Sequence, residues 1–464
     1  MQDCKTINTN IYIAMKRTLI HNATIINEGQ RKQGSLVIAD GRIAEILTDG
    51  RPLSAPCDET IDATGCCLLP GVIDDHVHFR DPGLTHKADI LSESRAAAAG
   101  GVTSIMDMPN TNPPTVTLEA LEQKQALLAE KCVVNHSCYF GATNDNYTLF
   151  PRLDRTRVCG IKLFMGSSTG NMLVDRMDSL RRIFGGTDML IAAHCEDQDI
   201  IRRNTEKYKA AYIEGADIPL NKHPYIRTVQ ACYASSRLAV QLATEAGARL
   251  HVMHVSTAKE LPLFSNAPLD ETKQITAEAC VAHLLFEMKD YRMLAACIKC
   301  NPAVKRQADR DALRRAVVEG QIDLIATDHA PHLLTEKTGG ALRAASGMPM
   351  VQFSLVSMLQ LADEGIFTPE LVVEKMCHAP ARLFRIEGRG FIREGYRADL
   401  VLVRPHTHWQ LTRDKILSKC GWSPLEGRTF EWQVEKTFAN GHLVYDHTTG
   451  VDDTYRGEEL RFHA

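Results

Sequence analysis

The middle of this chain, from about residue 68 to 385, repeats one pattern: a short apolar segment followed by a stretch of helical composition. The apolar segments are Val72–His78, Thr103–Met108, His136–Gly141, Gly160–Met165, Met189–His194, Leu250–Val255, Gln274–Ala279 and Leu324–Asp328. Eight strands that alternate with helices predict an α/β fold, a closed (β/α)8 barrel of the TIM type. The alternative is an open doubly wound sheet. No glycine-rich phosphate fingerprint follows the first strand, which disfavours the nucleotide-binding version of that sheet.

Both ends of the chain differ from the middle, because they consist of β-like runs joined by turn signals. Ser35–Ala39 precedes Asp40-Gly41, and Ala398–Val403 is followed further on by Asn440-Gly441. Both dipeptides favour hairpins. We therefore predict a small discontinuous β-sandwich domain that the chain leaves and re-enters. The predicted division is residues 1–68 for its N-terminal part, 69–384 for the barrel and 385–464 for its C-terminal part.

Composition excludes several kinds of partner. The 464 residues are 44% hydrophobic and 24% charged, with a net charge of −4, so we expect no nucleic-acid partner. No apolar run approaches the roughly 20 residues of a membrane span, so we expect no membrane insertion. The 14 cysteines follow no disulfide framework, which favours reduced thiols and a cytoplasmic location.

Polar side chains stand at the predicted carboxyl-terminal ends of several strands, where the functional residues of such barrels collect. The first strand ends in His76-Val77-His78. Residues two apart in a strand point to the same side, so both imidazoles can reach one metal ion, and imidazole suits zinc. Later strands contribute Lys162, His194, His254 and Asp328. This set predicts a metal centre.

Each candidate also has a structural interpretation. His194 and His254, taken singly, are equally well explained as hydrogen-bonded structural histidines. Lys162 could be a buried amine whose end reaches solvent. A charged amine inside an apolar run is costly, however, unless it is neutralised. His251 lies three residues before His254 and should face elsewhere, so we do not expect it to be a ligand.

Longer motifs around these residues resemble one enzyme family. The motifs are His76–Gly83, Thr85–Lys87, Met108–Thr111 and Thr327–His332. With the strand order His-x-His, Lys, His, His, Asp, they are similar to dihydroorotases of the type I branch of the amidohydrolase superfamily. The similarity runs from about residue 70 to 384. Residues 390–401 also resemble the segment by which that superfamily returns to its β domain.

The resemblance implies a centre of two Zn²⁺ ions per subunit. Its ligands would be His76, His78, Lys162, His194, His254 and Asp328. The first two histidines would bind the more buried zinc, and the last two would bind the second. Lys162 would carry CO₂ as N6-carboxylysine, whose two oxygens bridge the metals; some relatives bridge with an aspartate instead. Asp328 would bind the first metal and also transfer the proton of the attacking water.

The family's substrate carries a carboxylate; three residues are candidates to bind this group, and a fourth is a candidate to contact the ring. Arg80 lies two residues past His78, and a guanidinium can bind a carboxylate through two hydrogen bonds. Asn110 and His332 would add donors to the same group, and Asn301 matches a position that contacts the pyrimidine ring in relatives. The structural alternatives are an Arg80–Asp81 ion pair and an Asx turn at Asn110.

Two loops complete the predicted site. Gly166–Asn171 is small and polar, and in the family a loop here closes on the substrate. Animal relatives have a bulkier Thr-Phe pair where this chain has Ser168-Thr169, so the closing contacts differ. Ser346–Pro349 would supply backbone contacts to the ring, although it departs from the proline-rich family version.

The resemblance implies a dihydroorotase: reversible cyclisation of N-carbamoyl-L-aspartate to L-dihydroorotate with loss of water, the third step of pyrimidine synthesis. One alternative is another cyclic-amide hydrolase, a hydantoinase, dihydropyrimidinase or allantoinase, whose substrates lack the ring carboxylate. Another is a non-catalytic scaffold, although such relatives tend to lose metal ligands. Relatives suggest a homodimer and a possible aspartate transcarbamoylase partner.

Overall fold

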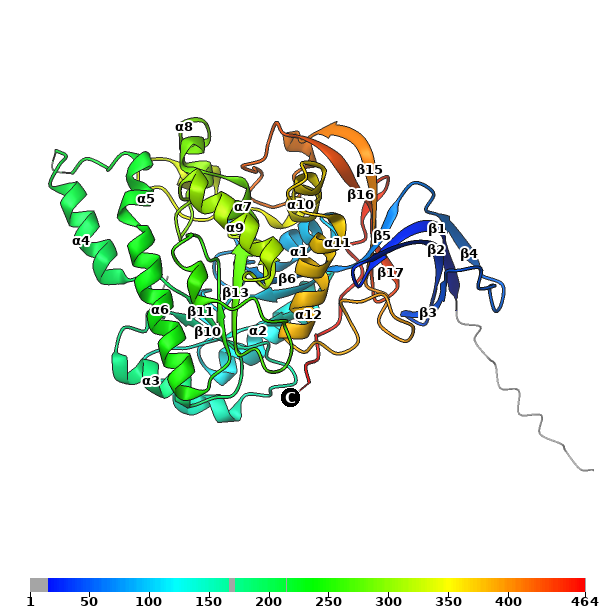
Figure 1. The fold of residues 1–464 in the computed structure, drawn as a ribbon, viewed down its shortest axis with the longest axis horizontal. Helices are drawn as coiled ribbons and strands as arrows, with labels where there is room; N and C mark the ends of the chain where they lie inside the picture. The colour runs from blue at the N-terminus through cyan, green and yellow to red at the C-terminus, as the bar shows by residue number, and fades with distance from the viewer. Residues whose placement is uncertain (1–15, 167–171, 214, 464) are drawn as a thin grey trace, which may run out of the picture.

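The computed structural model describes residues 16–166, 172–213 and 215–463, and its centre is a barrel of parallel strands (Figure 1). The strands are β6 (Val72–Val77), β7 (Val102–Asp107), β8 (Asn135–Cys138) continued by β9 (Phe140–Gly141), β10 (Ile161–Phe164), β11 (Ile191–His194), β12 (Leu250–Val252), β13 (Ile275–Cys280) and β14 (Leu324–Ala326). They pair in the runs β6-β7-β8 and β9-β10-β11-β12-β13-β14, and only Tyr139 separates β8 from β9. The predicted (β/α)8 barrel is confirmed, with strand bounds that differ by a few residues.

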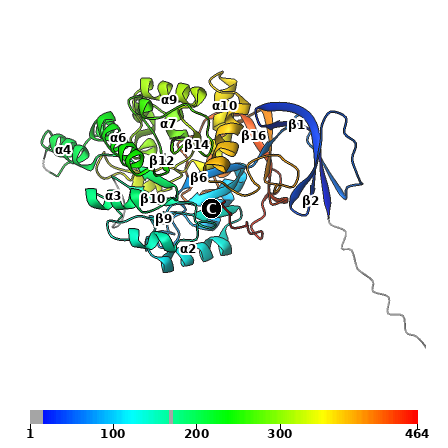
Figure 2. The same ribbon diagram turned by 60° about the horizontal axis from the view of Figure 1, so that its bottom comes forward.

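Helices cover the outside of these strands (Figure 2). They are α1 (Ile90–Ala99), α2 (Leu118–Lys131), α3 (Met177–Gly185), α4 (Gln198–Lys209), α5 (His223–Ile226), α6 (Val229–Ala246), α7 (Val281–Leu285), α8 (Tyr291–Leu294), α9 (Gln307–Glu319), α10 (Ser354–Asp363), α11 (Pro369–Val373) and α12 (Ala379–Leu383). Every residue of β6 and β7 is buried. This is the environment of strands in a parallel sheet, and half of the residues of these two strands are nevertheless polar.

Local sequence explains where the first barrel helix begins and ends. Asp89 Oδ1 accepts the backbone N–H of Ser92 at 2.8 Å, and Ser92 Oγ accepts that of Asp89 at 3.2 Å. This capping box satisfies two N–H groups at the start of α1. Gly100 follows its last residue, and Gly101 has a φ of 80°, a left-handed conformation that favours glycine. The chain can therefore turn at once into β7.

The first and last strands close the barrel next to the candidate site. His78 N–H donates to the carbonyl of His329 at 2.7 Å, and His329 N–H donates to that of His76 at 3.2 Å. The Asp74 carboxylate accepts the Thr327 hydroxyl at 2.6 Å and the Thr327 N–H at 3.2 Å. These bonds hold the segment that follows β14 against β6, so residues from the two ends of the barrel sequence meet.

A β-rich domain built from both ends of the chain accompanies the barrel, as predicted. Its strands among the described residues are β1 (Arg17–Asn27), β2 (Gln30–Ala39), β3 (Arg42–Leu47), β4 (Glu59–Asp62), β5 (Cys67–Pro70), β15 (Leu400–Gln410), β16 (Thr429–Ala439), β17 (His442–Asp446) and β18 (Gly450–Val451). They form one continuous sheet in the order β18-β17-β16-β15-β5-β1-β2-β3, with β4 beside β1 (Figure 1). Along β15, Leu400 and Leu402 join the domain's own core, whereas Val401 and Val403 join the barrel's core.

The last residues of the chain return to the barrel. His136 N–H donates to the carbonyl of Glu458 at 3.0 Å, and Leu460 N–H donates to that of His136 at 2.8 Å. Leu460 and Phe462 are buried in the cluster that includes Tyr139 of the barrel. Glu458 also pairs with Arg389 at 2.7 Å, so residues 458–462 contact both the barrel and the predicted C-terminal part. The division at residues 68 and 384 remains a proposal. No helix in the described ranges is long and apolar enough to cross a membrane.

Candidate metal centre and substrate pocket

The first candidate metal group lies where the end of β6 meets the segment after β14. His76 Nε2 and His78 Nε2 lie 3.2 and 3.1 Å from Asp328 Oδ1. Burial alone would raise the pKa of Asp328, but the neighbouring rings of His76 and His78 lower it to about 2. At neutral pH the group therefore presents an anionic oxygen to two imidazole nitrogens.

The second candidate group adjoins the first. His194, at the end of β11, has its Nδ1 atom 2.8 Å from Nε2 of His254, which follows β12. The ring centroids of His254 and His76 are 5.4 Å apart. His254, Asp328 and Arg80 have positive φ values of 40°, 48° and 67°. Such backbone conformations cost about 1–3 kcal/mol for non-glycine residues and cluster at functional sites.

Lys162, on β10, brings a buried amine to the same region. Its Nζ atom lies 2.6 Å from Met253 Sδ and 5.0 Å from the ring centroid of Phe164. Burial lowers the pKa of Lys162 to about 8, although Glu278 and Asp328 oppose this change. More of this amine is neutral near pH 7 than in an exposed lysine, so its nitrogen lone pair is more available for reaction.

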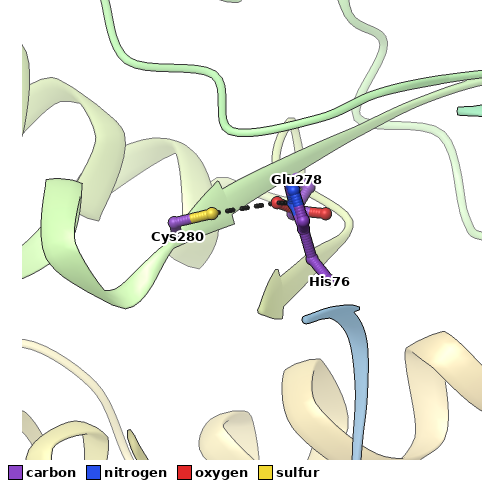
Figure 3. Close-up of side chains that lie close together, drawn as sticks. All are labelled: His76, Glu278 and Cys280. Atoms are coloured by element: carbon purple, nitrogen blue, oxygen red, sulfur yellow. Dashed lines mark hydrogen bonds and ion pairs between the residues drawn. The ribbon is translucent and has the colours of Figure 1, made fainter. Parts of the chain in front are cut away.

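The sequence interpretation missed the carboxylate that lies behind both groups. Glu278, on β13, has its Oε1 atom 2.9 Å from His76 Nδ1, and this oxygen also accepts the backbone N–H of His254 at 3.1 Å. Cys280 Sγ donates to the same oxygen at 3.0 Å; Figure 3 shows these side chains together. The available signal was a charged residue inside an apolar strand, the same signal that identified Lys162.

Two further contacts orient the other histidines. Glu196 Oε2 lies 3.1 Å from His194 Nε2 and pairs with Arg227, and both partners lower the pKa of Glu196 to about 2 against the effect of burial. His78 Nδ1 lies 2.8 Å from Asn110 Oδ1. The sequence offered one hint of this arrangement, a glutamate two residues after His194, and none for Arg227.

These hydrogen bonds determine which ring nitrogens face the centre. A carboxylate or an amide oxygen only accepts, so His76 and His78 carry their protons on Nδ1, and His194 carries its proton on Nε2. The opposite nitrogens therefore direct lone pairs toward Asp328 and His254. With neutral rings, these converging lone pairs and the Asp328 oxygen repel one another unless a cation, either a shared proton or a metal ion, lies among them. The described donor set fits a metal of the zinc type.

All the predicted site residues line one cavity of about 510 Å³. These are His76, His78, Arg80, Asn110, Lys162, His194, His254, Asn301, Asp328 and His332. Asp81 pairs with Lys131 at 2.9 Å, so the structure does not support the predicted alternative of an Arg80–Asp81 ion pair. His251 contacts Thr276 Oγ1 through Nδ1 at 2.9 Å and does not line the cavity, although it forms with Asp75 and Glu278 a further buried group that could hold a metal ion.

One of the two predicted loops can be described. Residues 167–171, most of the predicted closing loop, lie outside the described residues. Ser346 and Gly347 line the cavity, as expected for Ser346–Pro349. The buried Lys337 Nζ donates to the carbonyls of Ala345 and Gly347 at 2.8 and 2.6 Å. This side chain holds the backbone of that cavity wall in place.

Comparison with known proteins identifies the class of this chain. Residues 67–444 match the amidohydrolase family, and the chain belongs to that family. It is 35% identical over 432 residues to a dihydroorotase of Halobacterium salinarum, covering 89% of this chain and 96% of the relative. It is 29% identical over 435 residues to an allantoinase of Bacillus velezensis, covering 92% and 93%.

A solved structure gives the same result. An L-hydantoinase (dihydropyrimidinase) from Arthrobacter aurescens superposes with a TM-score of 0.85 at 26% identity, covering 96% of this chain and 97% of that one. The chain is thus a hydrolase that acts on cyclic-amide C–N bonds. Amidohydrolases generally bind a metal, and the groups described above are the candidates for its site.

Proposed function

We propose that this hydrolase is a dihydroorotase, which interconverts N-carbamoyl-L-aspartate and L-dihydroorotate in pyrimidine synthesis. The observation that supports dihydroorotate as the substrate is a buried cationic side chain, Arg80, in the cavity that the candidate metal ligands line. Arg80 is 7% exposed, lines the cavity and has its Nη2 atom 3.2 Å from His332 Nε2. A guanidinium binds a carboxylate strongly, and the rings of hydantoin and allantoin lack the carboxylate that dihydroorotate carries.

The donor set supports the metal-site assignment that the family resemblance implies. His76, His78 and Asp328 would hold one zinc, and His194 with His254 would hold a second. Lys162 would bridge them as N6-carboxylysine, because its buried amine becomes an anion with two oxygens only after it reacts with CO₂. When bound, the zinc ions would polarise the ring amide carbonyl and make a water more acidic.

The side chains would supply binding and proton transfer. Arg80, Asn110 and His332 would hold the ring carboxylate, and Asn301 would contact the ring. In the hydrolytic direction, Asp328 would accept the proton of the attacking water and deliver it to the ring nitrogen as the C–N bond breaks. The reverse sequence closes the ring and releases water.

The test of this proposal is a substrate panel with the purified, zinc-loaded protein. We expect turnover of L-dihydroorotate and N-carbamoyl-L-aspartate, with much weaker turnover of hydantoin and allantoin. Activity on hydantoin or allantoin alone would assign the chain to another cyclic-amide hydrolase. A preparation with native fold, no bound zinc and no turnover of any of the four compounds would favour the non-catalytic scaffold.

Replacement of Arg80 with methionine tests the carboxylate contact. We expect KM for L-dihydroorotate to rise about 100-fold, because two charge-assisted hydrogen bonds are lost, while kcat changes little. Steady-state kinetics measure both constants. Arg181 on α3 is exposed and pairs with Glu245, so Arg181→Met is the matched control. An unchanged KM in Arg80→Met would remove this residue from the substrate site.

Glu278→Gln tests the carboxylate that lies behind the centre. We expect the affinity for the first zinc to fall about 10- to 100-fold, because the partner that orients His76 loses its charge. Competition with a chelator measures that affinity. Glu260 is equally buried but bonds to Ser236 and Thr257, so Glu260→Gln should leave zinc affinity unchanged. Equal affinities in both variants would show that Glu278 does not orient a ligand.

Assembly and location remain part of the proposal. The family resemblance supports a homodimer in the cytoplasm, with an aspartate transcarbamoylase as a possible partner. Light scattering after gel filtration would distinguish a dimer of 51.5 kDa subunits from a monomer. Repeating the measurement with the transcarbamoylase of the same organism would show whether the two proteins associate.

A further inference from the structure

A lysine outside the predicted site contacts His332, one of the residues predicted to bind the substrate carboxylate. Lys87 lies in the segment between β6 and α1, and its side chain is 15% exposed. Its Nζ atom lies 3.1 Å from His332 Nδ1 and 2.8 Å from Glu336 Oε1. Glu336 Oε2 accepts the backbone N–H of Leu333, which holds this carboxylate in place.

The contact with Lys87 determines where the His332 ring carries its proton. An ammonium group only donates, so His332 Nδ1 must be the acceptor, and the neutral ring carries hydrogen on Nε2. The other side of the ring agrees, because His332 Nε2 lies 3.0 Å from the carbonyl oxygen of Ser346, which only accepts. Burial, together with the charges of Arg80 and Lys87, lowers the pKa of His332 to about 2, so the ring is neutral.

This proton position creates an unusual contact in the cavity. Arg80 Nη2 lies 3.2 Å from His332 Nε2, and both groups are then donors that cannot bond to each other. Arg80 Nε is held by the carbonyl of Pro331 at 3.1 Å, which keeps the guanidinium beside the ring. The two N–H groups lie side by side at the cavity wall, where both can donate to the oxygens of an anion, the His332 N–H while shared with the Ser346 carbonyl.

We propose that Lys87 is a positioning residue that determines specificity: it fixes His332 as the Nε2–H tautomer, so that His332 and Arg80 together donate to the substrate carboxylate. The identity of that carboxylate rests on the proposed function, whereas the tautomer does not. Without Lys87, the ring could carry its proton on Nδ1, which lies 3.7 Å from Glu336 Oε2. Nε2 would then lose its bond to the Ser346 carbonyl and accept from Arg80 instead. The two side chains would then satisfy each other instead of the substrate.

The alternative is that Lys87 only stabilises the loop through Glu336, and a double-mutant cycle separates the two roles. The probe is orotate, whose binding to the zinc-loaded protein is measured by calorimetry. We expect Lys87→Met to weaken binding about tenfold in the wild-type background, the value of one charge-assisted hydrogen bond. In a His332→Ala background, the same substitution should change binding less than about twofold. A tenfold loss in both backgrounds would overturn the proposal.

Lys289, an exposed lysine, supplies the matched control Lys289→Met.

The tautomer can be measured directly in the ligand-free protein by ¹⁵N NMR of labelled histidine, with His332→Asn to assign the signal. We expect Nε2–H in the wild type and a shift toward Nδ1–H in Lys87→Met. An Nδ1–H ring in the wild type, or an unchanged ring in Lys87→Met, would overturn the inference even if dihydroorotate is the substrate. The expected tautomers without orotate binding or dihydroorotate turnover would instead contradict the proposed function and the carboxylate role that depends on it.

Discussion

Lys162→Ala is expected to lower kcat for L-dihydroorotate by at least about a thousandfold and to remove tight binding of the second metal. The buried amine stands beside Asp328 and Glu278, and burial lowers its pKa to about 8. A neutral amine can react with CO₂. The resulting carbamate would supply two anionic oxygens between the pair His76 and His78 and the pair His194 and His254. Without the carbamate, His194 and His254 alone would hold the proposed second metal. Metal analysis and steady-state kinetics on the same preparation measure both effects.

Two experiments show whether Lys162→Ala acts through the missing carbamate or merely through the loss of a buried lysine. One restores activity with an added carboxylate, and the other is a control substitution. A small carboxylate such as acetate should restore part of the activity of Lys162→Ala, because it can occupy the position of the missing oxygens. Lys375 is also buried and donates to the carbonyl of Ile322, but it does not line the cavity, so Lys375→Met should keep both metals. Full activity with two metals in Lys162→Ala would refute the bridge.

The fold could be predicted from periodicity because barrel strands are buried on both faces. Several strands, such as β10, β11 and β14, read as short and largely apolar runs, and the capped helix after β6 begins where Asp89 and Ser92 indicate. Strand ends were less certain, since β12 stops at Val252 and leaves His254 in a loop with a φ of 40°. The continuity of the outer sheet was also not predictable, because the pairing of β5 with β15 joins residues more than 300 positions apart.

The candidate site could be predicted where a polar or charged residue interrupts or ends an apolar run. His76, Lys162 and Asp328 share that signal, and they line the same cavity. Glu278 carries the same signal but offered no ligand spacing, so its role emerges only from its contact with His76. Lys87 lies in a loop and has no periodic pattern. Its contact with His332 depends on how the loops after the first and eighth strands meet, which no local sequence pattern encodes.

Asp328→Asn is expected to lower kcat by about a thousandfold or more while the affinity for orotate changes less than about threefold. The asparagine keeps the shape and one oxygen of the side chain, but it cannot accept a proton from water. Asn also tolerates the positive φ of 48° at this position better than Ala, so the backbone should be conserved. Single-turnover kinetics and equilibrium binding separate the two quantities.

Comparison with Asp328→Ala distinguishes proton transfer from metal binding. Both variants lack the proton acceptor, but only alanine also removes the oxygen that lies 3.2 and 3.1 Å from His76 and His78. If proton transfer is the main role, both variants lose turnover alike, and the asparagine variant retains more of the first metal. If Asp328→Asn keeps wild-type turnover with its metals bound, the proton must be carried by another group. Among the described carboxylates, Glu278 would then be the first to test, because it lies behind His76 and bonds to it directly.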